Sequence, residues 1–134
     1  MLGLIKCSGR IEVEYSAPFY RVGVGVSIYM KYSSNPHTSW AFTFTAAERQ
    51  ALAIENQDRR VVVCLICGGD GCAKLEMRDV ETLCAPSAGS HRISCTRRHG
   101  EHYEVSGSSG RLDRKIAPSE WNRSLEALST HATH

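Results

Sequence analysis

One run of apolar residues stands out along the chain, Val61–Cys67, and a glycine-rich segment follows it. A continuous apolar run of this length, rich in β-branched residues, predicts a strand that is covered on both faces. Gly68–Gly71 contains three glycines and an aspartate, which tolerate the backbone angles of a tight reversal. We therefore expect Cys72–Met77 to return as the second strand of a central hairpin.

Alternating apolar and polar positions predict strands in the N-terminal third. Arg10–Tyr15 alternates apolar with charged residues, which is typical of a half-buried strand, and Leu2–Cys7 is its expected partner. The alternation is longest over Val22–Tyr32, which we interpret as one strand. Its glycines at positions 23 and 25 indicate a bulge or the close approach of another backbone.

A second alternating segment follows a polar loop. Trp40, Phe42 and Phe44 alternate with small residues after the loop Ser33–Ser39. Strands that are consecutive in sequence often pair, so we expect this segment to lie antiparallel to Val22–Tyr32.

Helices are predicted at three places. Thr45–Glu48 matches a capping box, which predicts a helix from Ala46 to about Asn56. The spacing of apolar residues favours a short helix over Arg78–Cys84, ending before a proline. Pro118 suits the start of a last helix, whose apolar stripe would be Trp121, Leu125 and Leu128.

The segment His91–Ser106 is expected to be a hairpin whose loop length follows from its apolar pattern. A two-residue turn would place Cys95 and Tyr103 on opposite faces. A three-residue loop at 98–100 pairs Cys95 with Tyr103 and Ile93 with Val105, which brings all four to one face. We therefore predict the three-residue loop.

These elements predict an α+β fold: a single domain over residues 1–128, with a largely antiparallel mixed sheet and two main helices packed on it. Residues 129–134 form a polar tail. A chain of 134 residues can bury a core without metal or disulfide, and 42% hydrophobic with 22% charged residues is typical of a soluble globule. No apolar run is long enough for a membrane span, and the N-terminus lacks a secretory signal. We expect a cytoplasmic protein.

Six cysteines raise the question of metal or redox chemistry. In the cytoplasm they would stay reduced and pack as small hydrophobes. Cys64–Gly71 matches the CxxCxGxG unit of DnaJ-type zinc chaperones, which makes Cys64, Cys67 and Cys72 a zinc alternative. That family uses two units per zinc, and a strand places Cys64 and Cys67 on opposite faces. Cys67 and Cys72 are expected to face each other across the hairpin. We predict no cofactor.

Positive charge gathers in the C-terminal third, although the whole chain carries only +2. Six Lys and Arg residues against three Asp and Glu residues lie between positions 92 and 115. This pattern predicts contacts to a phosphate backbone or to a protein partner. The alternative interpretation is a solvated hairpin in which Arg97 pairs with Glu101. The candidate binding residues are Arg92, Arg97, Arg98, His99, His102, Arg111, Arg114 and Lys115.

A metal-dependent nuclease is a second hypothesis. Glu12 and Glu14 share one strand face and Lys31 ends the long strand, which resembles the carboxylate and lysine pattern of restriction-endonuclease-like enzymes. Tyr29 stands where that family has an acidic residue, so the resemblance implies a catalytically degenerate copy.

The strings KYSSNPHTSWAFTF, VVVCLICGGDG, ISCTRR and YEVSGSSGRLDRKI together resemble a family of short bacterial proteins without an assigned activity. The resemblance supplies no catalytic residues. We expect a non-enzymatic cytoplasmic interaction module, accessory to nucleic-acid transactions or defence. Its binding edge would be the hairpin Arg92–Val105 with the loop Ser33–Trp40, and exposed strand edges would allow a homo-oligomer.

Overall fold

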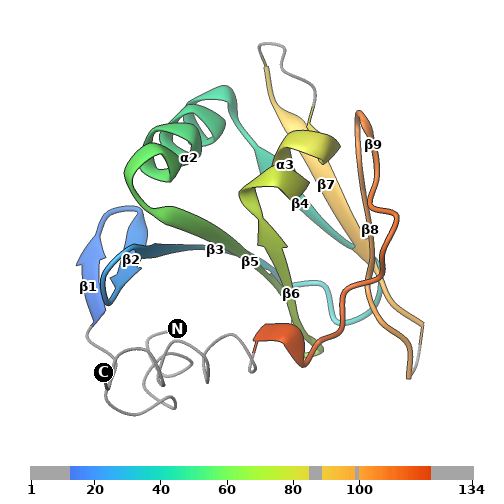
Figure 1. Cartoon of the computed structure of the whole chain (residues 1–134). Helices are drawn as coiled ribbons and strands as arrows, with labels where there is room; N and C mark the ends of the chain where they lie inside the picture. The colour runs from blue at the N-terminus through green and yellow to red at the C-terminus, as the bar shows by residue number, and fades with distance from the viewer. Residues whose placement is uncertain (1–12, 85–88, 99, 122–134) are drawn as a thin grey trace.

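The computed structural model describes residues 13–84, 89–98 and 100–121, and arranges them as an α+β fold of two mostly antiparallel sheets and two helices (Figure 1). The predicted fold class is therefore confirmed. Within this part of the chain, neither helix is long and apolar enough to cross a membrane. The expected strand Leu2–Cys7, Glu12 and most of the expected last helix lie outside the described residues. The strands are β1 Val13–Ser16, β2 Phe19–Val22, β3 Val26–Ser33, β4 Trp40–Phe44, β5 Arg60–Cys67, β6 Gly71–Glu76, β7 His91–Thr96, β8 Glu104–Gly107 and β9 Gly110–Arg111.

The five-stranded sheet has the order β1-β2-β3-β5-β6. Only β3 and β5 run parallel within it. The hairpin of β5 and β6 is confirmed, because Cys67 pairs with Gly71 and Val62 with Glu76 across it. Five successive residues of β5, from Val61 to Leu65, are buried, as a strand covered on both faces requires.

The prediction of one long strand over positions 22–32 is wrong. The chain reverses at Gly23–Gly25, so that Val22 pairs with Val26 and β2 lies antiparallel to β3. Gly23 and Gly25 have φ angles of +55° and +100°, which only glycine adopts at low cost. Val24 between them is fully exposed. A reversal of this length keeps Val22 and Val26 on one face, so the alternation continues across the turn and hides it.

The four-stranded sheet has the order β4-β7-β8-β9. The predicted pairing of Trp40–Phe44 with the preceding strand is therefore wrong, since β4 pairs with β7 instead. Trp40, Phe42 and Phe44 are all buried. In a separate sheet, the aromatic face of β4 covers the five-stranded sheet rather than extending it.

The hairpin of β7 and β8 is confirmed in its faces but not in its register. Cys95 pairs with Val105 and Ile93 with Gly107, which is two residues away from the prediction. Tyr103 instead forms an antiparallel bridge with Ile116, which draws it out of the hairpin ladder. Cys95, Tyr103 and Val105 remain buried on one face, because a shift of two residues preserves the side of every side chain.

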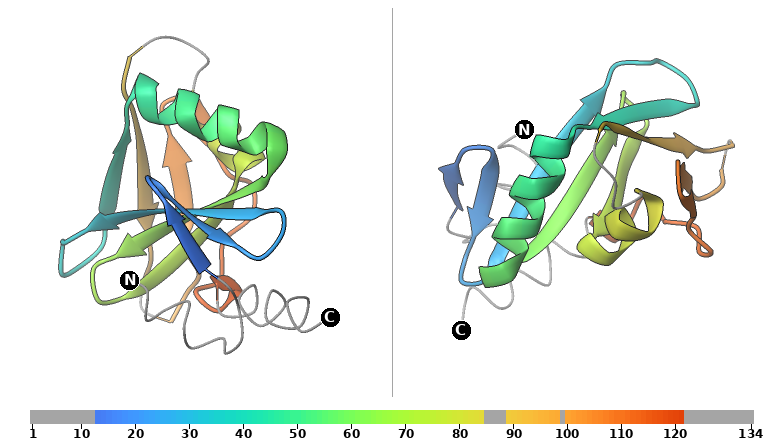
Figure 2. Two further views of the ribbon diagram at one scale, coloured as in Figure 1. Left: turned by 90° about the vertical axis from the view of Figure 1, so that its left-hand side faces the viewer. Right: turned by 90° about the horizontal axis from the view of Figure 1, so that it is seen from above.

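Both sheets and both helices contribute to one large core. Helix α2, Ala46–Asp58, begins with the predicted capping box, in which the Glu48 N–H donates to Thr45 and the Thr45 N–H donates to Glu48. Helix α3, Met77–Leu83, confirms the second predicted helix. Leu52 and Leu83 point from these helices into the core between the sheets. Figure 2 shows that neither helix lies on the outer side of the four-stranded sheet.

Candidate functional site

The outer face of the four-stranded sheet carries basic and hydroxyl side chains. Strands β4 and β7 alternate buried and outward positions, so Thr43, Arg92 and Thr96 are exposed. Arg111 of β9 pairs with Ser106 of β8 and is exposed. From strand spacing and rise, the Cα atoms of Arg92 and Arg111 lie roughly 12 Å apart. Two long cationic side chains therefore share one open surface.

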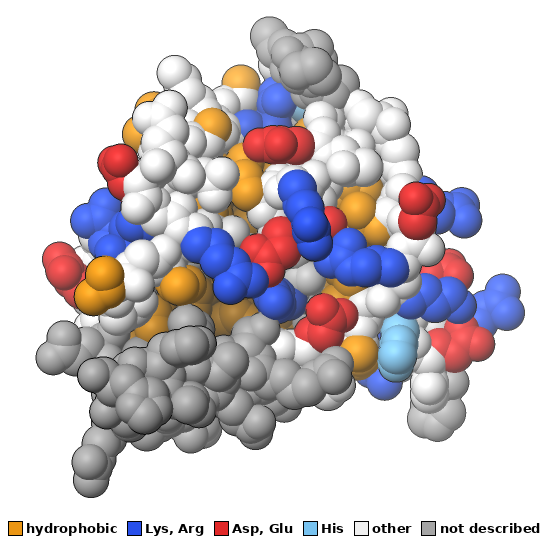
Figure 3. Space-filling view, in the orientation of Figure 1, with side chains coloured by type: hydrophobic (Ala, Val, Ile, Leu, Met, Phe, Trp, Pro, Cys, Tyr) orange, Lys and Arg blue, Asp and Glu red, His pale blue; other side chains and the backbone are white. Residues whose placement is uncertain are grey.

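Three of the predicted basic residues take part in ion pairs. Arg97 lies 2.9 Å from Asp70, and Arg114 makes two hydrogen bonds of 2.9 Å to Asp79. Lys115 lies 3.4 Å from Glu104 and 4.0 Å from Glu101. The expected pair of Arg97 with the Glu101 carboxylate is wrong, because the Arg97 Nε donates to the backbone oxygen of Glu101 instead. Figure 3 shows one face of the molecule on which Lys and Arg lie directly beside Asp and Glu.

The remaining described arginines of this region are Arg92, Arg98 and Arg111. Each is exposed, and none has an ion-pair partner within the described residues. His102 is exposed on the same hairpin, whereas His99 lies outside the described residues. The predicted basic set thus divides into residues that form ion pairs and exposed residues that form none within the described part of the chain.

The loop 34–39 lies against the tip of the β7–β8 hairpin. These are the two segments that were expected to lie together at one edge of the molecule. The Arg97 backbone N–H donates to Thr38 Oγ1 at 3.0 Å. Between loop and tip is a pocket of about 430 Å³. Its lining consists of Pro36, His37, Thr38, Trp40, Asp70, Arg97, Arg98 and Gly100.

Asp70 organises one wall of this pocket. Its Oδ2 accepts from the Tyr103 hydroxyl at 2.6 Å and from Arg97 at 2.9 Å. Burial raises the pKa of Asp70, but these two hydrogen bonds outweigh burial and leave the pKa below its usual value. Burial and the bond to Asp70 raise the pKa of Tyr103. At neutral pH the wall therefore presents an ionised carboxylate beside a guanidinium.

Backbone and side-chain hydrogen bonds hold the loop 34–39 in place. Asn35 Nδ2 donates to the Ser39 oxygen at 3.1 Å, and the Trp40 indole donates to the Asn35 oxygen at 2.8 Å. Gly68 has a φ of +54°, and a Cβ there would lie 2.4 Å from the same Asn35 oxygen. The close approach of the β5–β6 turn to this loop requires glycine.

Of the residues of the nuclease hypothesis, Glu14 and Lys31 are described, and these two do not converge. Glu14 of β1 is exposed and pairs with Arg21 of β2. Lys31 of β3 lies 2.6 Å from Glu48 and donates to the Thr43 oxygen at 2.6 Å. Arg21 in turn lies opposite Ser27 of β3. Lys31 is four residues further along β3, so its Cα atom lies roughly 13 Å from that of Ser27. Lys31 therefore binds Glu48 at the start of α2, and it does not form a metal-binding site with Glu14.

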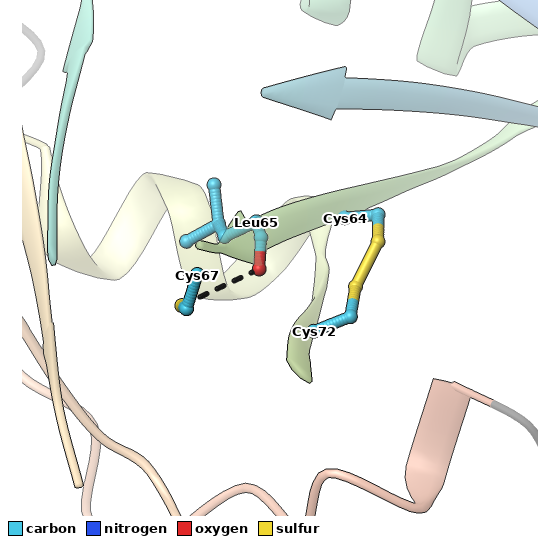
Figure 4. Close-up of a disulfide and its surroundings, with 4 residues drawn as sticks. All are labelled: Cys64, Leu65, Cys67 and Cys72. Atoms are coloured by element: carbon cyan, nitrogen blue, oxygen red, sulfur yellow. Dashed lines mark hydrogen bonds between the residues drawn. A yellow bond between two sulfur atoms is a disulfide. The ribbon is translucent and has the colours of Figure 1, made fainter. Parts of the chain in front are cut away.

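The three cysteines of the zinc alternative do not converge either. Cys64 and Cys72 form a disulfide, so the expectation of six reduced cysteines is wrong for these two (Figure 4). Cys67 belongs to the core on the opposite face of the five-stranded sheet. Gly71, not Cys72, pairs with Cys67, which corrects the expected facing of these two cysteines. Within the described residues, no group of three or more His, Cys, Asp or Glu residues is placed to hold a metal ion.

Sequence reasoning identified the loop and the hairpin tip but missed Asp70. In the sequence, Asp70 has the features of a turn residue within Gly68–Gly71. An acidic residue between glycines, far in sequence from the basic hairpin, is by itself a weak signal of a binding site. Only the packing of the two sheets brings it to Arg97 and Tyr103.

Comparison of the chain with protein-family models, curated proteins and solved structures found no match.

Proposed function

We propose that this protein is a non-enzymatic nucleic-acid-binding module that holds a phosphate backbone on the outer face of the four-stranded sheet. The observation that carries the proposal is the pair of exposed arginines on this face, Arg92 and Arg111, with the exposed Arg98 at the adjoining hairpin tip; none of the three has an ion-pair partner within the described residues. Arginine offers a planar fork of donors that matches phosphate oxygens.

The surroundings of these arginines support the same ligand. Thr43 and Thr96 are exposed on this face, and Ser94 and Ser106 lie side by side between them and Arg111. Hydroxyl groups and arginines are common phosphate contacts, and they position a strand without reading its sequence. Glu104, opposite Thr96 on the same face, lies 3.4 Å from Lys115, so the arginines supply the net positive charge of this face.

The proposal includes a cytoplasmic location, because a nucleic-acid-binding protein must be in a compartment that contains nucleic acid. The Cys64–Cys72 disulfide is uncommon in a reducing compartment and does not favour that location.

Fluorescence polarisation with labelled single- and double-stranded DNA and RNA tests the proposal at two salt concentrations. We expect binding that weakens with salt, and each of Arg92→Gln, Arg98→Gln and Arg111→Gln should lower the salt slope by about one. Arg78→Gln is the matched control, since Arg78 is exposed on α3, away from this face. Absence of binding at low salt would refute the proposal and direct the search to a protein partner.

A further inference from the structure

The pocket lined by Arg98 contains both a carboxylate and a guanidinium, whereas the outer face of the four-stranded sheet carries arginines without ion-pair partners. We propose that it accepts one unstacked base of a single strand whose backbone lies on that face, and that guanine is the base it fits. This inference rests on the proposed function and names its ligand more closely. It also implies that the module prefers single strands, because a base inside a duplex cannot enter a recessed pocket.

Charge separates this pocket from a phosphate site. Asp70 and Arg97 lie 2.9 Å apart on its wall, so their charges cancel, and a phosphate there would meet a carboxylate. A neutral ligand that both donates and accepts hydrogen bonds suits such a wall. Within the described residues, Asp70 Oδ1 has no hydrogen-bond partner, because Tyr103 and Arg97 both donate to Oδ2. Arg98 adds free donors at the rim.

Guanine complements these groups better than the other bases do. Its Watson–Crick edge presents two adjacent N–H donors for a carboxylate, and its O6 and N7 accept from arginine. Adenine, cytosine, thymine and uracil each present a single donor position on that edge. Because Asp70 Oδ2 already accepts from Tyr103 and Arg97, both guanine donors would converge on Oδ1, which has two lone pairs, and Arg98 would donate to O6.

Planar groups at the rim suit a base that has left its stack. His37 and Arg98 are exposed on the two sides of the pocket, one from the loop 34–39 and one from the hairpin tip. Bases stack on imidazole planes, so His37 can cover the face of the guanine while Arg98 meets its edge. The pocket volume of about 430 Å³ exceeds the size of one base, so a base and its sugar can enter.

The pocket is also formed in advance of binding. Its loop is tied to Trp40 by one hydrogen bond and to the Arg97 backbone by another. Trp40 and Tyr103 are fully buried and lie edge to face, with ring centroids 6.2 Å apart. Little conformational entropy is then lost when a ligand enters.

The test compares oligothymidylates that carry one central dG, dA or dC, by fluorescence polarisation at fixed salt. We expect the dG strand to bind about tenfold more tightly than the others. Asp70→Asn should reduce that preference to about threefold or less, and His37→Ala should weaken binding of the dG strand severalfold. His102→Ala is the matched control, because His102 is an exposed histidine of the same hairpin that does not line the pocket.

The outcomes separate the pocket from the face. Equal binding of all three strands, still sensitive to Arg92→Gln, would overturn the guanine pocket and leave the proposed function standing. A second measurement addresses the pocket alone: guanosine monophosphate, but not cytidine monophosphate, should shift the NMR signal of the Trp40 indole N–H. If the strands do not bind and this signal is also unmoved, both proposals fall. A shift without strand binding would refute only the phosphate-binding face.

Discussion

The pair formed by Arg114 and Asp79 allows a stability prediction that can be worked from the structure. Asp79 is buried, with a side chain 5% exposed, and it receives two hydrogen bonds of 2.9 Å from Arg114. It also accepts from the Glu76 backbone N–H at 2.8 Å, at the start of α3. Replacing Arg114 by glutamine leaves a buried carboxylate with one of its three hydrogen bonds.

The magnitude follows from these contacts. Removing the partner of a fully buried charge costs about 3–5 kcal/mol, whereas exposed pairs are worth about 0–1 kcal/mol. The Arg114 side chain is 46% exposed, so water screens part of the interaction. We expect Arg114→Gln to lower the free energy of unfolding by about 2 kcal/mol at pH 7. Lys115→Gln is the control, and its half-exposed pair should cost less than about 0.5 kcal/mol.

The pH dependence has a defined sign. Burial raises the pKa of Asp79, but hydrogen bonds from Arg114 and from the Glu76 backbone outweigh it and leave the folded-state pKa below the unfolded value. Ionised Asp79 therefore stabilises the fold above about pH 4, and this contribution is lost as the pH falls through the lower folded-state pKa. The effect of Arg114→Gln should shrink accordingly at low pH.

Urea denaturation followed by circular dichroism measures both effects, at pH 7 and at pH 3. A loss that is equal at the two pH values would refute the electrostatic reasoning and indicate a packing effect of the arginine stem. A loss no larger than that of Lys115→Gln at pH 7 would show that water screens the buried carboxylate after all.

Two further predictions concern the close approach at the β5–β6 turn and the buried thiols. Gly68→Ala should cost about 2–3 kcal/mol in urea denaturation, because it combines a left-handed residue with a Cβ against the Asn35 oxygen. Gly69→Ala, with open space around it, should change stability by less than about 0.5 kcal/mol, and equal effects would contradict the close approach. A hydrogen bond with Cys67, together with burial, raises the pKa of Cys95, and burial raises the pKa of Cys84. Iodoacetamide at pH 8 should therefore label Cys67, Cys84 and Cys95 only after unfolding, and peptide mass mapping that finds them labelled in the native protein would refute this.

Local signals in the sequence predicted the elements that depend on neighbouring residues. The capping box at Thr45 and the apolar run of β5 each determine their element within a few positions. The turn at Gly23–Gly25 was missed because it preserves the alternation of valines around it. Two glycines one residue apart were the available signal, and a bulge was the wrong interpretation of it.

Partner choice between distant strands was beyond local reasoning. Sequence proximity favoured pairing β4 with β3, but its three buried aromatic residues are needed to cover the core from a second sheet. The same limit applies to the site. The loop and the hairpin tip were both expected at the binding edge, whereas Asp70 joins them only through the packing of the two sheets. The proposed roles of the arginines and of the homo-oligomer edges stay predictions.

The path of the chain between the sheets has a consequence for how the protein folds. The chain leaves the first sheet after β3, contributes β4 to the second, and returns through α2 to β5. Neither sheet is thus encoded by a continuous segment, and β4 has no pairing partner until β7 has been synthesised. Such long-range pairing slows folding and leaves a strand edge open in the meantime. A nascent chain stopped before β7 would expose the aromatic segment Trp40–Phe44, which creates a risk of aggregation in this interval of synthesis.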